Sequence, residues 1–154
     1  REYIRSFGGP GDGPEQMASP HGIWMDTRGD KPALLVADRE HHRIQRFDLD
    51  GKLIDIIQGD LRRPSNFGQR GGYIAVADLE GRVTILDKDN KVVTHLGDNP
   101  DPKKRAQNGV PREEWQDGEF ISPHCARWDS EGNLYILDWL SQGRITKLKH
   151  VQPY

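Results

Sequence analysis

The chain of 154 residues carries 22 basic and 24 acidic side chains, and its formal net charge of −2 gives no general attraction to nucleic acid or to an anionic membrane. A mean hydropathy of −0.83 and the lack of any apolar run near the roughly 20 residues of a spanning helix exclude a helical membrane protein, and the single Cys125 excludes an internal disulfide framework. The 17 glycines, 10 prolines and only 34% hydrophobic residues favour many short strands joined by turns.

A strand is predicted first over residues 3–7, with nothing before it that could belong to the same sheet. From residue 17 onward one unit recurs three times. Each unit holds short runs rich in aliphatic and β-branched side chains, and the runs led by arginine alternate apolar and polar residues, which is typical of strands and not of helices. The predicted units span residues 17–59, 60–97 and 119–151, with an insertion at 98–118.

The spacing of the units is typical of the blades of a β-propeller. Asp38 and Asp78, which end the second run of the first two units, are 40 residues apart, and a four-stranded blade has this length. The first two units supply four strands each and the third supplies three. The expected fold class is therefore all-β, with about three four-stranded antiparallel blades in an incomplete ring, because propellers generally have four to eight blades.

Residues 1–8 are interpreted as the outer strand of a preceding blade that this sequence lacks. The expected partners are the remaining blades of the ring or a second copy of the chain, since a part of a ring leaves apolar blade faces exposed. Two copies could form one six-bladed ring, with residues 3–7 of each completing the third blade of the other.

Two tripeptides point to a site in the central channel. Ser19-Pro20-His21 and Ser122-Pro123-His124 open the first and third units, whereas the second unit has Pro64-Ser65 at this place. Histidines on alternate blades would face one another across the channel, where a metal ion could bind. In the other interpretation, both histidines only begin inner strands and bond a backbone carbonyl.

An aspartate and an arginine recur in every unit, just before and just after the second hairpin. Recurrence in each blade favours a structural role, either in capping turns or in ion pairs between blades. These residues are Asp38, Asp78 and Asp138 with Arg43, Arg82 and Arg144.

The steps Pro-x-Gly-Ile, Val-Ala-Asp, His-Arg-Ile-Gln and Asp-Gly-Lys resemble the NHL-repeat family of β-propellers, over nearly the whole chain outside the insertion. More narrowly, Ser19-Pro20-His21 followed by Val-Ala-Asp-Arg-Glu at residues 36–40 is similar to the peptidyl-α-hydroxyglycine amidating lyases. Those enzymes are six-bladed and release glyoxylate from α-hydroxyglycine-ended peptides. The resemblance implies the C-terminal half of such a propeller, a peptide or small-molecule substrate, and a secreted or periplasmic location.

The lyase family holds a catalytic zinc with three histidines on alternate blades, each in a Pro-His step. His21 and His124 match two of these ligands, and the third would precede Arg1, so the chain is expected to be incompetent for chemistry alone. Arg39 matches an active-site arginine of the family. Cys125 stands where the family has an acidic ligand of a structural calcium, which argues against a calcium site here.

Trp139 occupies in the third unit the place that Arg39 has in the first, and is therefore expected to contact substrate at the mouth of the channel. The alternative function is a non-catalytic NHL scaffold that binds a protein or another ligand through its loop face, with residues 98–118 as its variable loop. A ring of two copies would place histidines on blades one, three, four and six, and so would alter or remove the metal centre.

Overall fold

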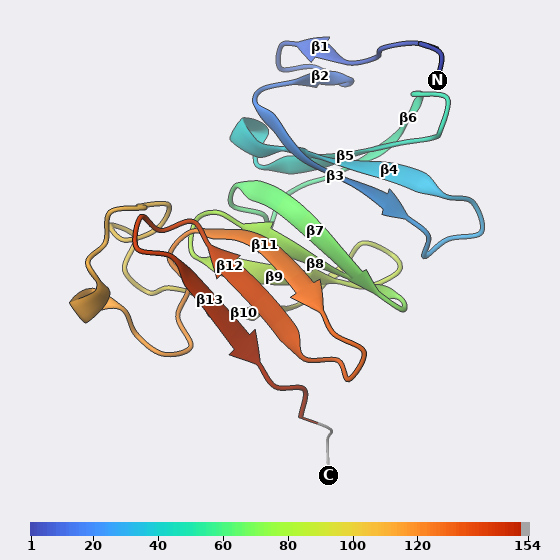
Figure 1. The fold of residues 1–154 in the computed structure, drawn as a ribbon. Coiled ribbons are helices and arrows are strands. Elements are labelled where there is room, and N and C mark those ends of the chain that lie inside the picture. The colour runs from blue at the N-terminus through green and yellow to red at the C-terminus, as the bar shows by residue number, and fades with distance from the viewer. Residues whose placement is uncertain (152–154) are drawn as a thin grey trace.

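The computed structural model describes residues 1–151 and shows an all-β chain with three larger sheets that follow one another along an arc, and one short two-stranded sheet (Figure 1). The fold class expected from the sequence is confirmed. In each of the three larger sheets consecutive strands are antiparallel neighbours, so each of these sheets is a simple meander. No helix within residues 1–151 is long and apolar enough to cross a membrane.

Each of the three larger sheets is called a blade below. Blade one consists of β3 (Pro20–Asp26), β4 (Ala33–Asp38), β5 (Arg43–Phe47) and β6 (Leu53–Ile57). Blade two consists of β7 (Pro64–Arg70), β8 (Tyr73–Asp78), β9 (Arg82–Leu86) and β10 (Val92–Leu96). Blade three consists of β11 (Pro123–Trp128), β12 (Leu134–Asp138) and β13 (Arg144–Leu148).

The first strands of the three blades, β3, β7 and β11, lie side by side along the inner side of the arc (Figure 1). Glycine allows this approach, because a Cβ on Gly22 would collide with the carbonyl oxygen of Ser65, and one on Gly68 with that of Ala126. The starts of the three inner strands are thereby brought together, and with them the residues that the sequence placed in the channel.

Substitution of Gly68 by alanine is expected to lower the free energy of unfolding by about 1–3 kcal/mol, because the added methyl group overpacks the contact between β7 and β11. Gly72→Ala is the matched control, since its Cβ would lie 4.0 Å from the nearest atom, on Lys88. Urea unfolding of both variants measures the difference. Equal stability of the two would contradict the close approach of the inner strands.

Apolar side chains fill the two spaces between successive blades. Leu35 and Ile44 of blade one pack against Phe67 and Leu86 of blade two. Blades two and three enclose a second cluster, made of Ala75, Ala77, Val83, Ile85, Phe120, Ala126, Leu134 and Ile136. Each blade therefore buries one face against the next, as the repeat of the sequence requires.

The N-terminal segment differs from the expected strand, while its assignment to a preceding blade stays a prediction. Residues 1–8 form no strand, and Tyr3 and Ile4 are exposed. A strand needs a neighbouring strand for its hydrogen bonds, and the structure of residues 1–151 offers none beside this segment. After it, β1 (Gly9–Pro10) and β2 (Gln16–Met17) form a short parallel pair.

Two 3-10 turns complete the fold. The turn η1 (Arg39–His41) joins the second and third strands of blade one, and η2 (Arg112–Glu114) lies within the insertion at 98–118. The loop that holds η2 is attached to blade two through the backbone, where Asn99 donates to the carbonyl of Gly81 at 2.9 Å. It is also bonded to the loop between β12 and β13 of blade three, where the N–H of Ser141 donates to the carbonyl of Asn108 at 2.8 Å.

Candidate metal centre

His21 and His124, the two histidines of the Pro-His steps, meet at the starts of β3 and β11. Their ring centroids are 4.6 Å apart and the ring planes are nearly perpendicular, at 84°. Blade two lies between the blades that carry them, and its residue at this position, Ser65, is fully buried. The alternation seen in the sequence therefore brings two imidazoles together over a small residue.

Ser65 contacts both Pro-His segments, which the sequence did not reveal. Nδ1 of His21 lies 2.9 Å from the carbonyl oxygen of Ser65. The hydroxyl of Ser65 donates to the carbonyl of Ala77 at 2.8 Å and lies 3.1 Å from the carbonyl of Pro123. The two interpretations of the histidines are thus compatible, because His21 bonds a backbone carbonyl and still faces His124.

The surroundings of His124 favour its neutral form. Burial lowers the pKa of the His124 imidazole below its ordinary value, and the nearby His21 and Arg39 lower it further. A neutral imidazole has a free electron pair on one ring nitrogen, which is the form that binds a metal ion. His124 is therefore in a form that can act as a ligand near neutral pH.

Arg39 and Trp139 lie at the same end of the blades as the histidine pair. The Trp139 ring is exposed, and its centroid is 6.2 Å from that of His124. Arg39 opens the turn η1, and its Nε donates to Glu40 at 2.9 Å. Glu40 also accepts a hydrogen bond of 2.6 Å from Arg63, which, with the charge of that arginine, lowers the pKa of the Glu40 carboxyl. The four residues singled out from the sequence are thus brought to one region.

Buried aspartates hold the loops that lead into the two Pro-His steps. One oxygen of Asp38 accepts the backbone N–H of Ala18 at 2.9 Å, three residues before His21. In blade three, Asp138 accepts the N–H groups of Ile121 and Ser122 at 3.0 and 2.8 Å, just before His124. The second oxygen of each aspartate receives the arginine that begins the next strand, Arg43 at 2.7 Å and Arg144 at 2.7 Å.

These contacts confirm a structural role for the recurring pairs and correct their placement. The ion pairs lie within blades, because the aspartate and the arginine are directly opposite each other in the register of the second and third strands. The sequence had left ion pairs between blades as one possibility. The aspartates of these pairs also hold the loop before the inner strand, in blade one and in blade three.

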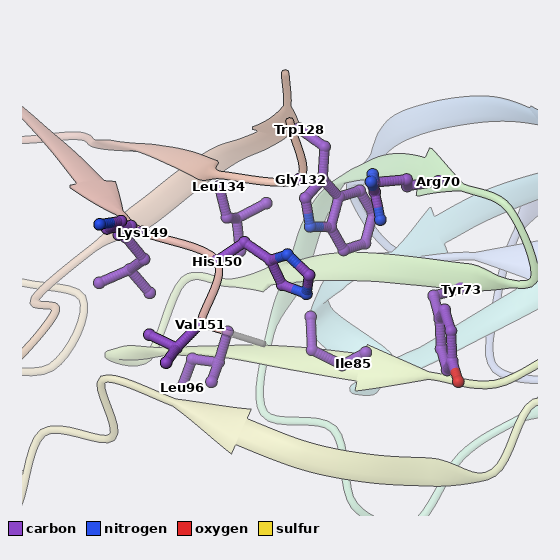
Figure 2. Close-up of a pocket in the computed structure, with 11 residues that line it drawn as sticks. Arg70, Tyr73, Ile85, Leu96, Trp128, Gly132, Leu134, Lys149, His150 and Val151 are labelled. Carbon is purple, nitrogen blue, oxygen red and sulfur yellow. The ribbon is translucent and has the colours of Figure 1, made fainter. Parts of the chain in front are cut away.

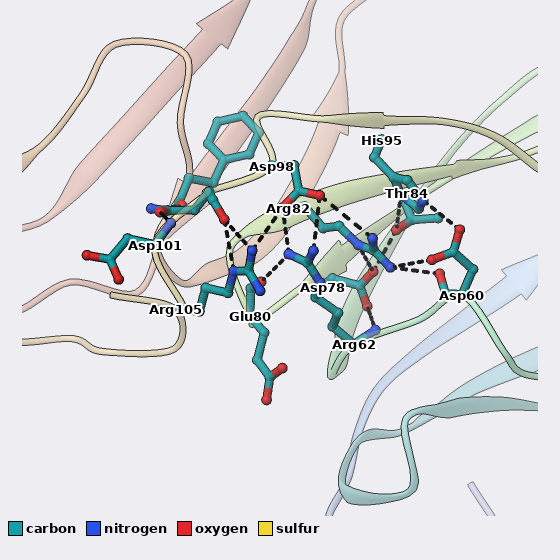
Figure 3. A network of polar contacts seen from close by, with 12 residues as sticks. Asp60, Arg62, Asp78, Glu80, Arg82, Thr84, His95, Asp98, Asp101 and Arg105 are labelled. Atoms are coloured by element: carbon teal, nitrogen blue, oxygen red, sulfur yellow. Dashed lines mark hydrogen bonds and ion pairs between the residues drawn. The ribbon is translucent and has the colours of Figure 1, made fainter. Parts of the chain in front are cut away.

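Blade two extends this arrangement into a larger polar network (Figure 3). Asp78 is fully buried, accepts a hydrogen bond of 2.6 Å from Thr84, and lies 3.5 Å from Nε of Arg82. Burial raises the pKa of the Asp78 carboxyl above its ordinary value. His95 joins the same network, with its Nδ1 3.1 Å from the hydroxyl of Thr84 and its Nε2 2.7 Å from Asp60.

The described residues offer two candidate metal ligands and not a complete set. No group of three or more histidine, cysteine, aspartate or glutamate side chains within residues 1–151 could hold a metal ion. Cys125 is a free, half-buried thiol beside His124 in the sequence. The pair of imidazoles fits zinc in ligand type, and the ligand count is one below the three that catalytic zinc usually takes from protein.

A separate groove of about 530 Å³ opens between blades two and three, and is lined mainly by apolar side chains (Figure 2). Trp128 and Leu134 lie in it together with His150, which is near the end of the chain. His124 is the second residue of β11 and Trp128 is its last, so the groove lies about 13 Å along the strand from the histidine pair. It is therefore distinct from the candidate metal centre.

No protein-family model matches the chain. A stretch of 51 residues is 43% identical to protein lin-41 of Caenorhabditis elegans, an NHL-repeat protein, and covers 33% of this chain and 4% of that one. Among solved structures, a catalytically inactive histidine-to-alanine variant of virginiamycin B lyase from Staphylococcus aureus with quinupristin superposes with a TM-score of 0.55 at 15% identity. That match covers 88% of this chain and 42% of the lyase chain.

The chain folds as part of a β-propeller. The similarity to lin-41, an NHL-repeat protein, extends over one third of the chain. Because the chain spans less than half of each of these proteins, it corresponds to a portion of such a ring.

Proposed function

We propose that this part of a propeller carries one side of a zinc-dependent lyase centre, in which His21 and His124 supply two imidazole ligands. The observation that carries the proposal is the pair itself, with ring centroids 4.6 Å apart at the starts of alternate blades. The third ligand is assigned to the remaining blades or to a second copy of the chain. The chain alone is then a weak zinc binder and is incompetent for catalysis.

The contacts around the pair support this assignment. Histidines that bind metals usually engage their second ring nitrogen with a backbone carbonyl or a carboxylate, which fixes the ring orientation. The carbonyl of Ser65 does this for Nδ1 of His21, and leaves Nε2 for the metal. The buried hydroxyl of Ser65 connects the same point to Pro123, one residue before His124.

The proposed substrate class is a peptide or small molecule with a terminal α-hydroxyglycine, as the resemblance to the amidating lyases implies. Bound zinc would act as a Lewis acid on the hydroxyl group of such a substrate. Arg39 would bind the carboxylate through its planar guanidinium, with Glu40 holding Nε. The Trp139 ring would cover the apolar side of the substrate beside His124. The solved neighbour is also a lyase, and its histidine-to-alanine variant is inactive.

Cobalt(II) substitution tests the proposal directly, because Co²⁺ replaces Zn²⁺ in such sites and absorbs visible light. The expected result is a saturable visible spectrum, with paramagnetic shifts of the imidazole protons of His21 and His124. If Co²⁺ leaves both imidazoles unshifted, the chain has no zinc site. The chain would then be better described by the alternative function, a propeller scaffold without catalysis.

A further inference from the structure

The groove between blades two and three has an apolar lining to which both blades contribute. Its aliphatic residues include Ile85 of β9, Leu96 of β10, Leu134 of β12 and Leu148 of β13. Its volume of about 530 Å³ lies within the range of roughly 300–1,000 Å³ that is usual for small-molecule sites. The groove can therefore hold the apolar body of a ligand of that size.

The polar side chains of the lining include basic groups and no carboxylate. Within residues 1–151 they belong to Arg70, Tyr73, Lys149 and His150, beside the indole of Trp128. The two acidic residues of the neighbouring hairpin between β11 and β12 are engaged within that hairpin. Glu131 accepts a hydrogen bond of 3.1 Å from the side chain of Asn133, and Asp129 accepts the N–H groups of Glu131 and Asn133 at 3.0 and 2.9 Å.

The guanidinium of Arg70 is seated against the backbone of Gly132. A Cβ on Gly132 would lie 3.0 Å from both Cζ and Nη2 of Arg70. The φ of Gly132 is +90°, so glycine meets both the turn and the close contact. Figure 2 shows Arg70 at one end of the groove, on the side of Gly132 and Trp128. A positive charge is thus held at the rim of an apolar hollow.

The segment that follows β13 forms another wall of the groove and is tied to the same hairpin. The backbone N–H of His150 donates to Oδ1 of Asn133 at 3.0 Å. Asn133 is itself buried, and its Nδ2 donates to Asp129 at 2.9 Å. This wall is therefore fixed by hydrogen bonds before any ligand binds, which lowers the entropic cost of binding.

We propose that this groove binds a free, small apolar carboxylate, such as a medium-chain fatty acid. The carboxylate would accept two parallel hydrogen bonds from the planar guanidinium of Arg70. The hydrocarbon chain would lie along the aliphatic lining, and Lys149 would add to the positive potential of the groove. A neutral apolar molecule would leave the guanidinium without a partner, and a hydrophilic anion would leave the apolar lining unused.

This site is independent of the candidate metal centre and goes beyond the proposed function. It involves neither His21 nor His124, which lie about 13 Å away along β11. Carboxylate binding in the groove is therefore expected whether or not the chain binds zinc.

Titration of the full chain with decanoate below its micelle-forming concentration tests the site, with proton–nitrogen NMR as the readout. The expected result is a saturable shift of the indole N–H of Trp128 and of the backbone amides of Gly132 and Leu134. Decanol should bind about tenfold more weakly, because it lacks the charge-assisted hydrogen bonds to Arg70. Each CH₂ group removed from decanoate should lower the affinity about three- to fourfold.

Arg70→Gln is expected to weaken decanoate binding by about tenfold and to leave decanol binding unchanged. Arg112→Gln is the matched control, since Arg112 is also exposed but lies in η2 of the insertion. The control should keep the affinity for decanoate. Arg70 is likewise exposed, so both variants should keep the dispersed spectrum of a folded chain.

Four results would each overturn the proposal: no saturable shift at Trp128, shifts confined to residues outside the groove, equal affinities for decanoate and decanol, or equal losses in Arg70→Gln and Arg112→Gln. Binding of the chain to fatty-acid-containing vesicles without binding of free decanoate would indicate a membrane surface as the partner and would also overturn it. The comparison of decanoate with decanol uses the unsubstituted chain, so it decides the question even if a variant fails to fold.

Discussion

Substitution of Asp38 by alanine is expected to lower the free energy of unfolding by about 3–5 kcal/mol, the cost of breaking a buried ion pair from one side. Asp38 is fully buried. Its carboxylate accepts the N–H of Ala18 at 2.9 Å and hydrogen bonds from Arg43, His41 and Gln45 at 2.7, 2.8 and 3.1 Å. Since a domain of this size has a stability of about 5–15 kcal/mol, the loss would be a large part of the total.

The pH dependence of Asp38 gives this prediction a second readout. Burial alone would raise the pKa of the Asp38 carboxyl, but the hydrogen bonds from Ala18, His41 and Arg43 outweigh it and hold the pKa below its ordinary value. A lowered folded-state pKa stabilises the fold above the ordinary aspartate pKa, and this stabilisation is lost as the pH falls through the folded-state value. Asp38→Ala should therefore lose less stability in acid than the unsubstituted chain does.

Chemical unfolding at neutral and acidic pH measures both effects. Asp48→Ala is the control, because Asp48 only caps an exposed turn through the N–H groups of Asp50 and Lys52, and its loss should cost about 1 kcal/mol. Equal losses from Asp38→Ala and Asp48→Ala would show that the buried cluster adds nothing to the stability of blade one.

Substitution of either His21 or His124 by alanine is expected to weaken zinc binding by about a hundredfold or more. Replacing even a residue that only orients a metal ligand lowers metal affinity about 10–100-fold. The imidazoles lie 4.6 Å apart and are the only two ligands proposed on this chain, so one remaining ligand would not retain the ion. Isothermal titration with zinc measures the loss.

His150→Ala is the control for these variants. His150 lines the groove between blades two and three, about one strand length from the pair, and its loss should leave zinc affinity unchanged. Zinc binding that persists in both His21→Ala and His124→Ala but is lost in His150→Ala would move the site to the groove and contradict the channel assignment.

Much of the fold could be predicted because the same strand pattern occurs three times. Repetition shows which residues are structural, so a structural role for Asp38 and Asp138 could be recognised without a structure, whereas the location of their ion pairs within blades could not. The strand predicted over residues 3–7 failed because local pattern cannot supply the neighbouring strand on which pairing depends. Phe7 packs on Phe47, although its backbone lacks the hydrogen bonds of a strand.

The candidate site could be predicted from the sequence only in part. His21 and His124 stood out by their shared Pro-His step, and the structure brings them together. In the sequence, Ser65 is only the residue that stands where a histidine is missing. Its contacts in the structure are with backbone carbonyls of β8 and β11, which no sequence pattern predicts. The same limit applies to Glu40, whose link to Arg63 joins segments 23 residues apart.

The most direct test of the central claim, that His21 and His124 form one side of a zinc centre, is a native mass spectrum of the zinc-supplemented chain. It reports bound metal and the number of chains together. The account predicts a species that retains zinc and loses it when both histidines are replaced by alanine, whereas His150→Ala keeps it. A metal-free species of any mass, at saturating zinc, would contradict the claim and leave a propeller piece that acts only as a scaffold.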